Sequence, residues 1–163
     1  MVDTRLARLS DAEAIRAIYN HYVTTTTVTF DMVPRSLEQQ EAWLSERSGA
    51  LAVIVAVDVD DRVIGFASLS PYKPRPAYRT SVENSVYVDP GSARQGVGRA
   101  LMARLIEVAN DHGYHAMMAR IADANPASVG LHEAVGFELV GIEKEVGRKF
   151  NRWLDVAVMQ RLL

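Results

Sequence analysis

Helical spacing of apolar residues marks the start of the chain. Ser10 and Asp11 precede this apolar face and are residues that typically cap helix N-termini. The face consists of Ala14, Ile15, Ile18 and Tyr22. Residues 23–30 are mostly β-branched and include four consecutive threonines, so we expect an extended segment there. Ser36 then predicts the cap of a second helix, whose apolar residues are Leu37, Trp43 and Leu44.

The middle of the chain has the pattern of buried strands. Residues 51–57 and 62–70 are two apolar runs separated by Asp-rich residues 58–61, which predicts a hairpin. Residues 71–79 are rich in proline and basic side chains and are expected to form a loop. Residues 80–88 predict another strand, which ends at an Asp-Pro-Gly turn.

From residue 97 onward the apolar residues recur with the spacing of an amphipathic helix. Its apolar face is Val97, Leu101, Leu105 and Val108. Gly113 is typical of the residue that ends such a helix, and residues 116–121 predict a strand. Asn125 is the expected cap of a shorter helix with Pro126 at its first position. Residues 137–142 and 153–162 predict two closing strands.

The resulting order is β-α-α-β-β-β-α-β-α-β-β. An antiparallel first half leads into a βαβ unit, which predicts a mixed α/β (α+β) fold with one central mixed sheet flanked by helices. No linker or repeat divides the chain, so residues 1–163 are expected to form a single domain.

Composition limits the classes of protein to which the chain can belong. The absence of cysteine excludes disulfides and thiolate chemistry, and it suits a cytoplasmic protein. The charged first eight residues do not have the pattern of a signal peptide, and the longest apolar run, 51–57, is too short to span a membrane. A net charge of −2 argues against nucleic-acid binding. His21, His112 and His115 lack metal-ligand spacing, so no metal is expected.

The turn at residues 94–99, Arg-Gln-Gly-Val-Gly-Arg, lies between a predicted strand and a predicted helix. Glycines let a ligand approach the backbone, and the first N–H groups and the dipole of a helix favour an anion such as pyrophosphate. Simple helix capping is the alternative. A P-loop would require Lys-Ser or Lys-Thr after Gly98, and a dinucleotide fingerprint would require a third glycine.

This turn and its surroundings resemble the acetyl-CoA site of the GNAT acyltransferase superfamily. The matching segments are residues 85–90, 95–98, 125–128 and 136–137. Four further strings, at residues 17–22, 82–88, 131–137 and 153–156, make nearly the whole chain resemble the phosphinothricin and methionine sulfoximine N-acetyltransferases. Ala93 differs from the superfamily pattern, which has Gln or Arg there, and the neighbouring Arg94 is the available replacement.

The resemblance implies acetyl-CoA as cosubstrate. The cofactor contacts that it implies are Val86, Tyr87, Val88, Arg94, Gln95, Gly96, Val97, Gly98, Arg99, Asn125 and Ser128. It also implies that the backbone N–H of Val88 polarises the thioester carbonyl. Asn125 would then serve as helix cap and cofactor contact together.

Chemistry at the acceptor amine requires a base, because a free amine near pH 7 is mostly protonated. The resemblance aims Glu83 at the amine, and the alternative is a solvated carboxylate or an ion pair with Arg79. His132 stands where many superfamily members have a tyrosine that protonates the thiolate. Imidazole could act there as acid or as second base, and the alternative is a packed histidine that does not titrate.

The acceptor side follows from the resemblance as well. Its implied contacts are Phe30, Arg75, Arg79, Glu83, Asn84 and Ser85, with the segment 149–151 near the substrate or a dimer contact. Arg75 or Arg79 could hold the carboxylate of an amino-acid-like acceptor, or could be ordinary solvated charges. The expected function is acetyl transfer to the α-amino group of a small acceptor such as phosphinothricin, methionine sulfoximine or methionine sulfone, by a cytoplasmic homodimer. The alternatives are acetylation of protein N-termini or polyamines, and a non-catalytic acyl-CoA-binding regulator.

Overall fold

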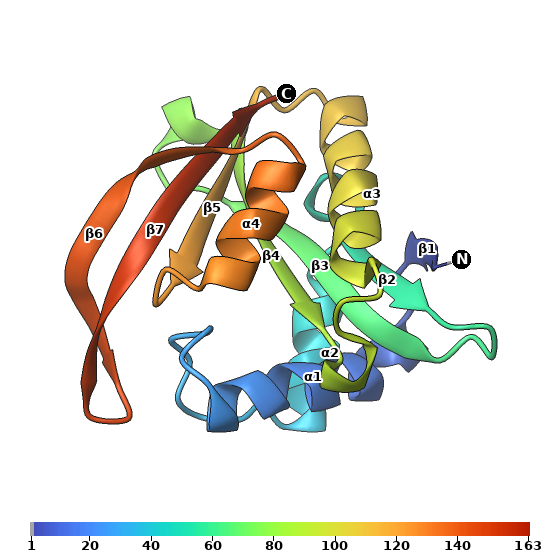
Figure 1. Cartoon of the computed structure of the whole chain (residues 1–163). Helices are drawn as coiled ribbons and strands as arrows, with labels where there is room; N and C mark the ends of the chain where they lie inside the picture. The colour runs from blue at the N-terminus through green and yellow to red at the C-terminus, as the bar shows by residue number, and fades with distance from the viewer. Residues whose placement is uncertain (1) are drawn as a thin grey trace.

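A computed structural model describes residues 2–163 as one seven-stranded sheet with helices on both faces (Figure 1). The strand order is β1-β2-β3-β4-β5-β7-β6, and all neighbours are antiparallel except β4 and β5. The strands are β1 (Asp3–Leu6), β2 (Val53–Val57), β3 (Val63–Pro71), β4 (Ser81–Val88), β5 (Ala116–Ala122), β6 (Glu138–Lys149) and β7 (Arg152–Leu162). The helices are α1 (Ala12–Thr25), α2 (Leu37–Ser45), α3 (Val97–Asp111) and α4 (Pro126–Ala134). This order confirms the predicted α/β class with a single mixed sheet.

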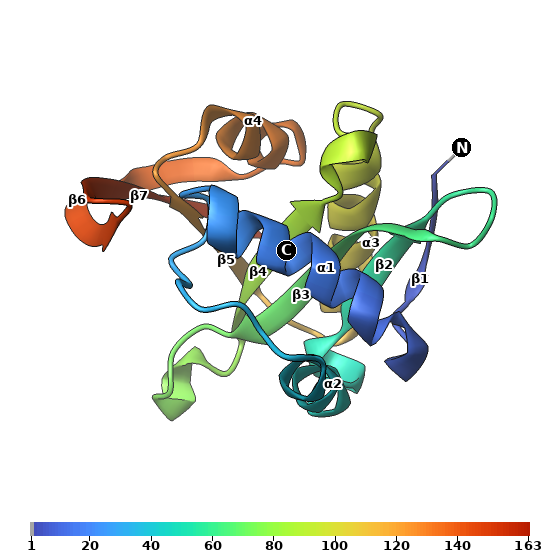
Figure 2. The same ribbon diagram turned by 90° about the horizontal axis from the view of Figure 1, so that it is seen from below.

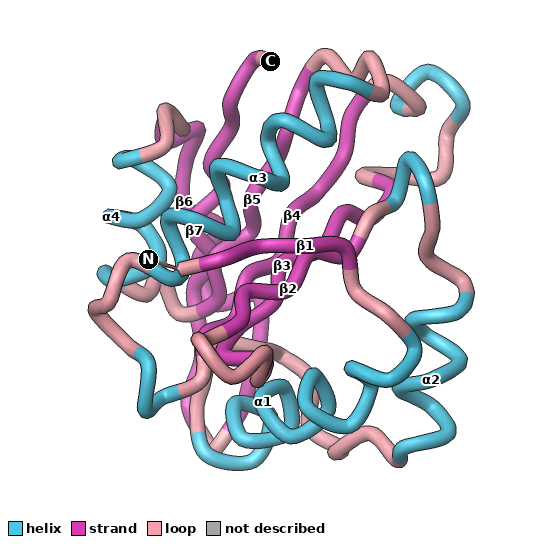
Figure 3. The backbone as a smooth tube through the Cα atoms, turned by 90° about the vertical axis from the view of Figure 1, so that its right-hand side faces the viewer, coloured by secondary structure: helices cyan, strands magenta, loops and turns pink. Residues whose placement is uncertain are grey.

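Two hydrophobic cores lie on opposite faces of the sheet. On one face the buried side of α3, including Leu101 and Leu105, packs on β3, β4, β5 and β7. On the other face α1 contributes Ile15 and Val23, which pack on β2 and β3 around Phe66. Seen from below, α1 crosses in front of β3 and β4 (Figure 2), and the side view separates α3 and α4 from α1 and α2 (Figure 3). The central strands are therefore a middle layer between the two sets of helices.

Such a gap opens between β4 and β5. The two strands pair only at Ser81–Ala116, Val82–Met117 and Glu83–Met118, and they diverge beyond these positions (Figure 1). From residue 84 to residue 88, β4 pairs with β3 on one side and has no strand partner on the other. The opening leaves main-chain N–H and C=O groups of β4 available to a ligand.

The expectation of an extended segment at residues 23–30 was partly wrong, because α1 continues through Thr25. Val23 is buried against the sheet, so tertiary packing overrides the strand preference of a β-branched residue. The hydroxyls of Thr24, Thr25 and Thr26 donate to the carbonyls one turn earlier, at 2.6 to 2.9 Å. These bonds satisfy the threonine side chains within the last turn of the helix.

The strand predicted at residues 137–142 is longer in the structure, where β6 extends to Lys149. The added part is mostly charged and lies in the edge strand, so it lacks the alternation that reveals a half-buried strand. Phe150 and Asn151 form the turn to β7 with φ of 50° and 59°. A two-residue turn with positive φ at both positions matches the twist of a hairpin.

Candidate active site

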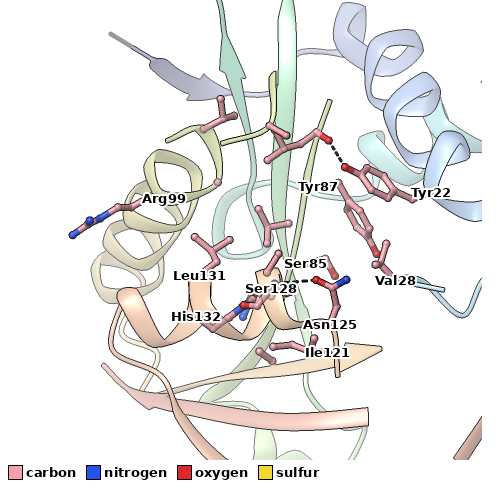
Figure 4. A pocket seen from close by; sticks show the side chains of 18 of the residues that line it. Tyr22, Val28, Ser85, Tyr87, Arg99, Ile121, Asn125, Ser128, Leu131 and His132 are labelled. Atoms are coloured by element: carbon pink, nitrogen blue, oxygen red, sulfur yellow. Dashed lines mark hydrogen bonds between the residues drawn. The ribbon is translucent and has the colours of Figure 1, made fainter. Parts of the chain in front are cut away.

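A cavity of about 490 Å³ occupies the opening between β4 and β5 (Figure 4). Its walls come from β4, the start of α3, β5, α4 and the end of α1 with the loop that follows it. The predicted site residues that line it are Glu83, Asn84, Ser85, Val86, Tyr87, Val88, Arg94, Gly96, Val97, Gly98, Arg99, Asn125, Ser128 and His132. The tertiary structure thus brings most of the predicted donor and acceptor groups to one place.

Four predicted site residues do not line this cavity. The Gln95 side chain turns back and donates to the carbonyl of Gly91 at 3.4 Å. Phe30 packs its ring against the backbone of Gly147 instead. Arg75 and Arg79 flank the short turn Pro76–Tyr78, and the lining includes neither of them. Their contacts with cofactor or acceptor stay predictions.

The start of α3 has the backbone geometry of a turn that favours an anion. Arg94 and Gly96 have φ of 62° and 80°, and Gly96 is the N-cap without a side-chain cap. Within the described chain, no backbone N–H from residue 94 to residue 99 donates to a protein acceptor. A series of free N–H groups in such a turn forms a concave anion site, and the helix dipole adds to it.

The surroundings of Gly98 leave little room for a side chain and carry no negative charge. A Cβ added at Gly98 would lie 3.1 Å from Leu131 and 3.7 Å from Val88, so a side chain here would enter the space between α3 and α4. The first turn of α3 contains no acidic residue. Arg99 lines the rim of the cavity, and its exposed side chain extends toward solvent (Figure 4), where its charge can act on an anion without filling the site.

The start of α4 faces the start of α3 across the cavity (Figure 4). Asn125 caps this helix, because its Oδ1 accepts from the N–H of Ser128 at 3.1 Å, and Pro126 occupies the first helical position as predicted. The predicted cofactor contact Asn125 therefore positions a second predicted contact, Ser128.

The outer end of β4 exposes a backbone donor to the opening. Asp89 N donates to Ile64 O at 2.9 Å, which sets the phase of the antiparallel ladder between β3 and β4. Because bonded pairs alternate along such a ladder, the N–H of Val88 points away from β3 and into the opening. The Tyr22 hydroxyl donates to the carbonyl of Val88 at 2.5 Å and fixes this end of the strand.

Glu83 lies at the last paired position of β4, where the opening begins. Its carboxylate is half-buried in the cavity wall, and burial raises its pKa above the ordinary glutamate value, while Arg120 opposes that rise. Among residues 2–163 it has no ion-pair partner, so the alternative of a bridge to Arg79 is absent. A carboxylate with a raised pKa in a cleft is suited to proton transfer near neutral pH.

His132 is buried in the wall formed by α4. Its Nδ1 lies 2.7 Å from the carbonyl of Ser128, and its Nε2 lies 3.0 Å from Oδ1 of Asn84. Its ring also packs edge-on against Phe137. Burial lowers the pKa of His132, while the bond to Ser128 opposes that shift.

Sequence reasoning missed several lining residues, notably Tyr22, Val28, Arg120 and Leu131. Three of them are apolar or aromatic, with nothing in the sequence to separate them from core residues. Arg120 carried a usable signal, because it is the single charged residue in the predicted strand 116–121. In residues 2–163 no group of three or more His, Asp or Glu side chains could hold a metal ion. The same residues contain no helix long and apolar enough to cross a membrane.

Comparison with known proteins agrees with this geometry. Residues 4–158 match the model of the acetyltransferase (GNAT) domain. The chain is 42% identical over 156 residues to a phosphinothricin N-acetyltransferase of Streptomyces coelicolor, covering 94% of this chain and 91% of the relative. It is 40% identical over 157 residues to an L-methionine sulfoximine/L-methionine sulfone acetyltransferase of Pseudomonas aeruginosa, covering 96% and 91%.

A solved structure shows the same fold with the cosubstrate bound. The GNAT-superfamily phosphinothricin acetyltransferase of Sinorhizobium meliloti, crystallised with acetyl-CoA, superimposes with a TM-score of 0.96 at 37% identity, covering 99% of this chain and 88% of that one. With a family match over residues 4–158 and a shared architecture, the chain belongs to the GNAT acetyltransferase family, whose members use acetyl-CoA.

Proposed function

We propose that this enzyme transfers the acetyl group of acetyl-CoA to the α-amino group of a small amino-acid-like acceptor. The observation that carries the proposal is that Glu83 and the start of α3 line one cavity from opposite faces of the sheet. An acyl donor held by the helix terminus would thus meet an acceptor beside the carboxylate. The names of the relatives support phosphinothricin, methionine sulfoximine and methionine sulfone as acceptors.

The donor side would bind acetyl-CoA, which supplies the activated acetyl thioester. The free N–H groups of the turn at residues 94–99 hold its pyrophosphate, with Arg94 and Arg99 adding positive charge. The unpaired edge of β4, at Val86, Tyr87 and Val88, offers main-chain groups to the pantetheine arm. Asn125 and Ser128 contact the same arm from α4.

The reacting groups have separate roles. Glu83 accepts the proton of the acceptor amine, directly or through water, so that the nitrogen can attack the acetyl carbonyl carbon. The N–H of Val88 stabilises the negative charge that develops on the carbonyl oxygen. As the carbon–sulfur bond breaks, the CoA thiolate must gain a proton, and His132, which lines the cavity, is the side chain to which we assign this role.

The charge of the cavity favours an amino acid over a polyamine. Its lining contains one carboxylate, Glu83, and three arginines, at positions 94, 99 and 120. A polyamine would bring several positive charges into this surrounding, whereas an amino acid brings a carboxylate that an arginine can bind. Asn84 and Ser85 complete the predicted acceptor contacts that line the cavity.

A thiol-release assay tests this function directly. The purified chain should release CoA thiol from acetyl-CoA when L-methionine sulfone, L-methionine sulfoximine or phosphinothricin is added, and mass spectrometry should detect the N-acetyl product. Peptides beginning with alanine and spermidine serve as comparison acceptors. Preferential turnover of spermidine or the peptide would contradict the proposal, and acetyl-CoA binding without turnover of any amine would indicate a regulator.

We also propose where the enzyme acts and in which oligomeric state. Residues 1–163 would act as one cytoplasmic domain, able to confer resistance to an amino-acid-like herbicide or antibiotic. Exposed apolar side chains gather on the edge hairpin of β6 and β7, and these are Leu139, Val140, Val146, Phe150 and Trp153. An apolar edge strand is the part of a sheet most suited to pairing with another chain, so we expect a homodimer. Light scattering on the parent and on Val140→Glu should give dimer and monomer masses respectively.

A further inference from the structure

Arg120 contributes to the charge of the cavity, but the function described above gives it no contact of its own. We propose that Arg120 binds the carboxylate of the acceptor and thereby selects α-amino acids over simple amines. The inference rests on the proposed function, because it identifies the group that recognises the acceptor whose amine Glu83 deprotonates.

The alternation of β4 and β5 places Arg120 on the acceptor side of the sheet. Met117, Ala119 and Ile121 belong to the core under α3, so Arg120 points to the opposite face, which α1 covers. On β4, Val82 belongs to the same α3 core, which places Glu83 on the α1 face too. Glu83 and Arg120 therefore line one cavity from the same side of the sheet.

The pairing of the strands brings the two side chains close together. Glu83 is opposite Met118 in the last parallel pair, and Arg120 is two residues further along β5 on the same face. The positive charge of Arg120 acts on Glu83, opposing the rise that burial causes in its pKa. The ammonium and carboxylate of an α-amino acid are bonded to one carbon, so their recognition requires such a neighbouring acid and guanidinium.

The guanidinium of Arg120 is held in place and retains free donors. Its Nη2 lies 2.5 Å from Oε1 of Glu143 on β6, and within the described chain this is its one ion-pair partner. A guanidinium has five N–H donors, so a ligand carboxylate can still bind to the side that Glu143 leaves free. The Arg120 side chain is 37% exposed, which keeps it accessible from the cavity.

The other arginines near the site are less well placed. Arg94 and Arg99 line the cavity at the start of α3, on the donor side of the sheet. Arg75 and Arg79 lie outside the lining. Arg120 is thus the arginine of the cavity lining that faces the acceptor.

The experiment compares two acceptors that differ only at the carboxylate, L-methionine sulfone and its α-carboxamide. In Arg120→Gln, kcat/KM for the acid should fall about 10- to 100-fold, as expected for loss of a charge-assisted hydrogen bond, and kcat/KM for the carboxamide should change less than about threefold. For Arg120→Lys, kcat/KM for the acid should lie between the values of the parent and the Gln variant, because lysine keeps the charge but lacks the paired N–H donors of a guanidinium. KM for acetyl-CoA should not change in either variant.

Matched variants separate this role from others. Arg104→Gln removes a comparably exposed arginine of α3 that also pairs with a glutamate, and it should leave both acceptors unaffected. If kcat/KM in Arg120→Gln fell equally for the acid and the carboxamide, Arg120 would act by supporting Glu83 or the fold, and the proposal would be wrong. A selective loss in the double variant Arg75→Gln/Arg79→Gln, but not in Arg120→Gln, would overturn it as well. A parent enzyme that acetylates neither compound but acetylates another amine would refute the proposed function, and this inference with it.

Discussion

The amide of Asn84 joins the active-site histidine to the point where the sheet opens. Its Oδ1 lies 3.0 Å from Nε2 of His132, and its Nδ2 donates to the carbonyl of Met118 at 3.0 Å. Met118 is the last residue of β5 that pairs with β4. One buried side chain thus fixes both the width of the opening and the position of the imidazole, a role distinct from the predicted contact of Asn84 with the acceptor.

The buried His132 should make the stability of the fold depend on pH. Burial lowers its pKa in the folded state, so between that value and the ordinary histidine pKa the unfolded chain binds more protons. The free energy of unfolding should therefore fall as pH is lowered through this window. Denaturant titrations from pH 5 to 8 should show a weaker fall in His132→Gln, while the exposed His115→Gln should behave as the parent. Identical slopes in all three proteins would contradict a lowered pKa for the buried His132.

Glu83→Gln should separate proton transfer from binding. The variant keeps shape and hydrogen bonding but loses basicity, so kcat/KM near pH 7 should fall about 10²- to 10⁴-fold. The loss should shrink at high pH, where the amine deprotonates unaided, and acetyl-CoA binding should persist. Because burial raises the pKa of Glu83, the parent should lose activity on acidification at a pH above the ordinary glutamate pKa. The exposed Glu107→Gln is the control, and a Glu83→Gln variant with parental activity would exclude Glu83 as the base.

Gly98→Asp should weaken acetyl-CoA binding. The new side chain would project between α3 and α4 beside Leu131, and its charge would face the anion held by the helix terminus. Like charges at this range cost on the order of 1 kcal/mol even when well solvated, so the affinity measured by calorimetry should fall at least about fivefold. Gly130→Asp introduces the same charge on α4, where a Cβ meets nothing within 4 Å, and should leave affinity unchanged. Equal acetyl-CoA affinities of the parent and Gly98→Asp would show that the turn is not part of the binding site.

Lys149 ties the β6–β7 hairpin to the loop after α1. Its buried ammonium donates to the carbonyls of Thr29 and Asp31, each at 2.9 Å. Lys149→Met would leave both carbonyls without this partner, which should lower the free energy of unfolding by about 1–3 kcal/mol. Lys144→Met removes an exposed lysine of the same strand and should cost less than about 0.5 kcal/mol. If chemical denaturation gave similarly small losses of stability for Lys149→Met and Lys144→Met, the contacts of Lys149 would not stabilise the fold.

The sequence by itself determined the order of elements and the anion-binding turn. Hydrophobic periodicity, the cap at Asn125 and the glycines at positions 96 and 98 are local signals, and each depends on neighbours within a few residues. Alternation along the strand also places Glu83 and Val82 on opposite faces, and Val82 lies in the core under α3. Such features are readable because side-chain direction follows from the period of the element itself.

Only the tertiary structure decided which residues share the cavity. Arg120 enters the site because β4 and β5 pair over three residues and then separate, a distance relationship that no local pattern encodes. Packing of Val23 kept α1 helical where threonine propensity favoured a strand. The bond between Asn84 and His132 joins residues 48 positions apart. These features depend on long-range contacts, whose free energy exceeds the small differences in intrinsic preference that a sequence displays.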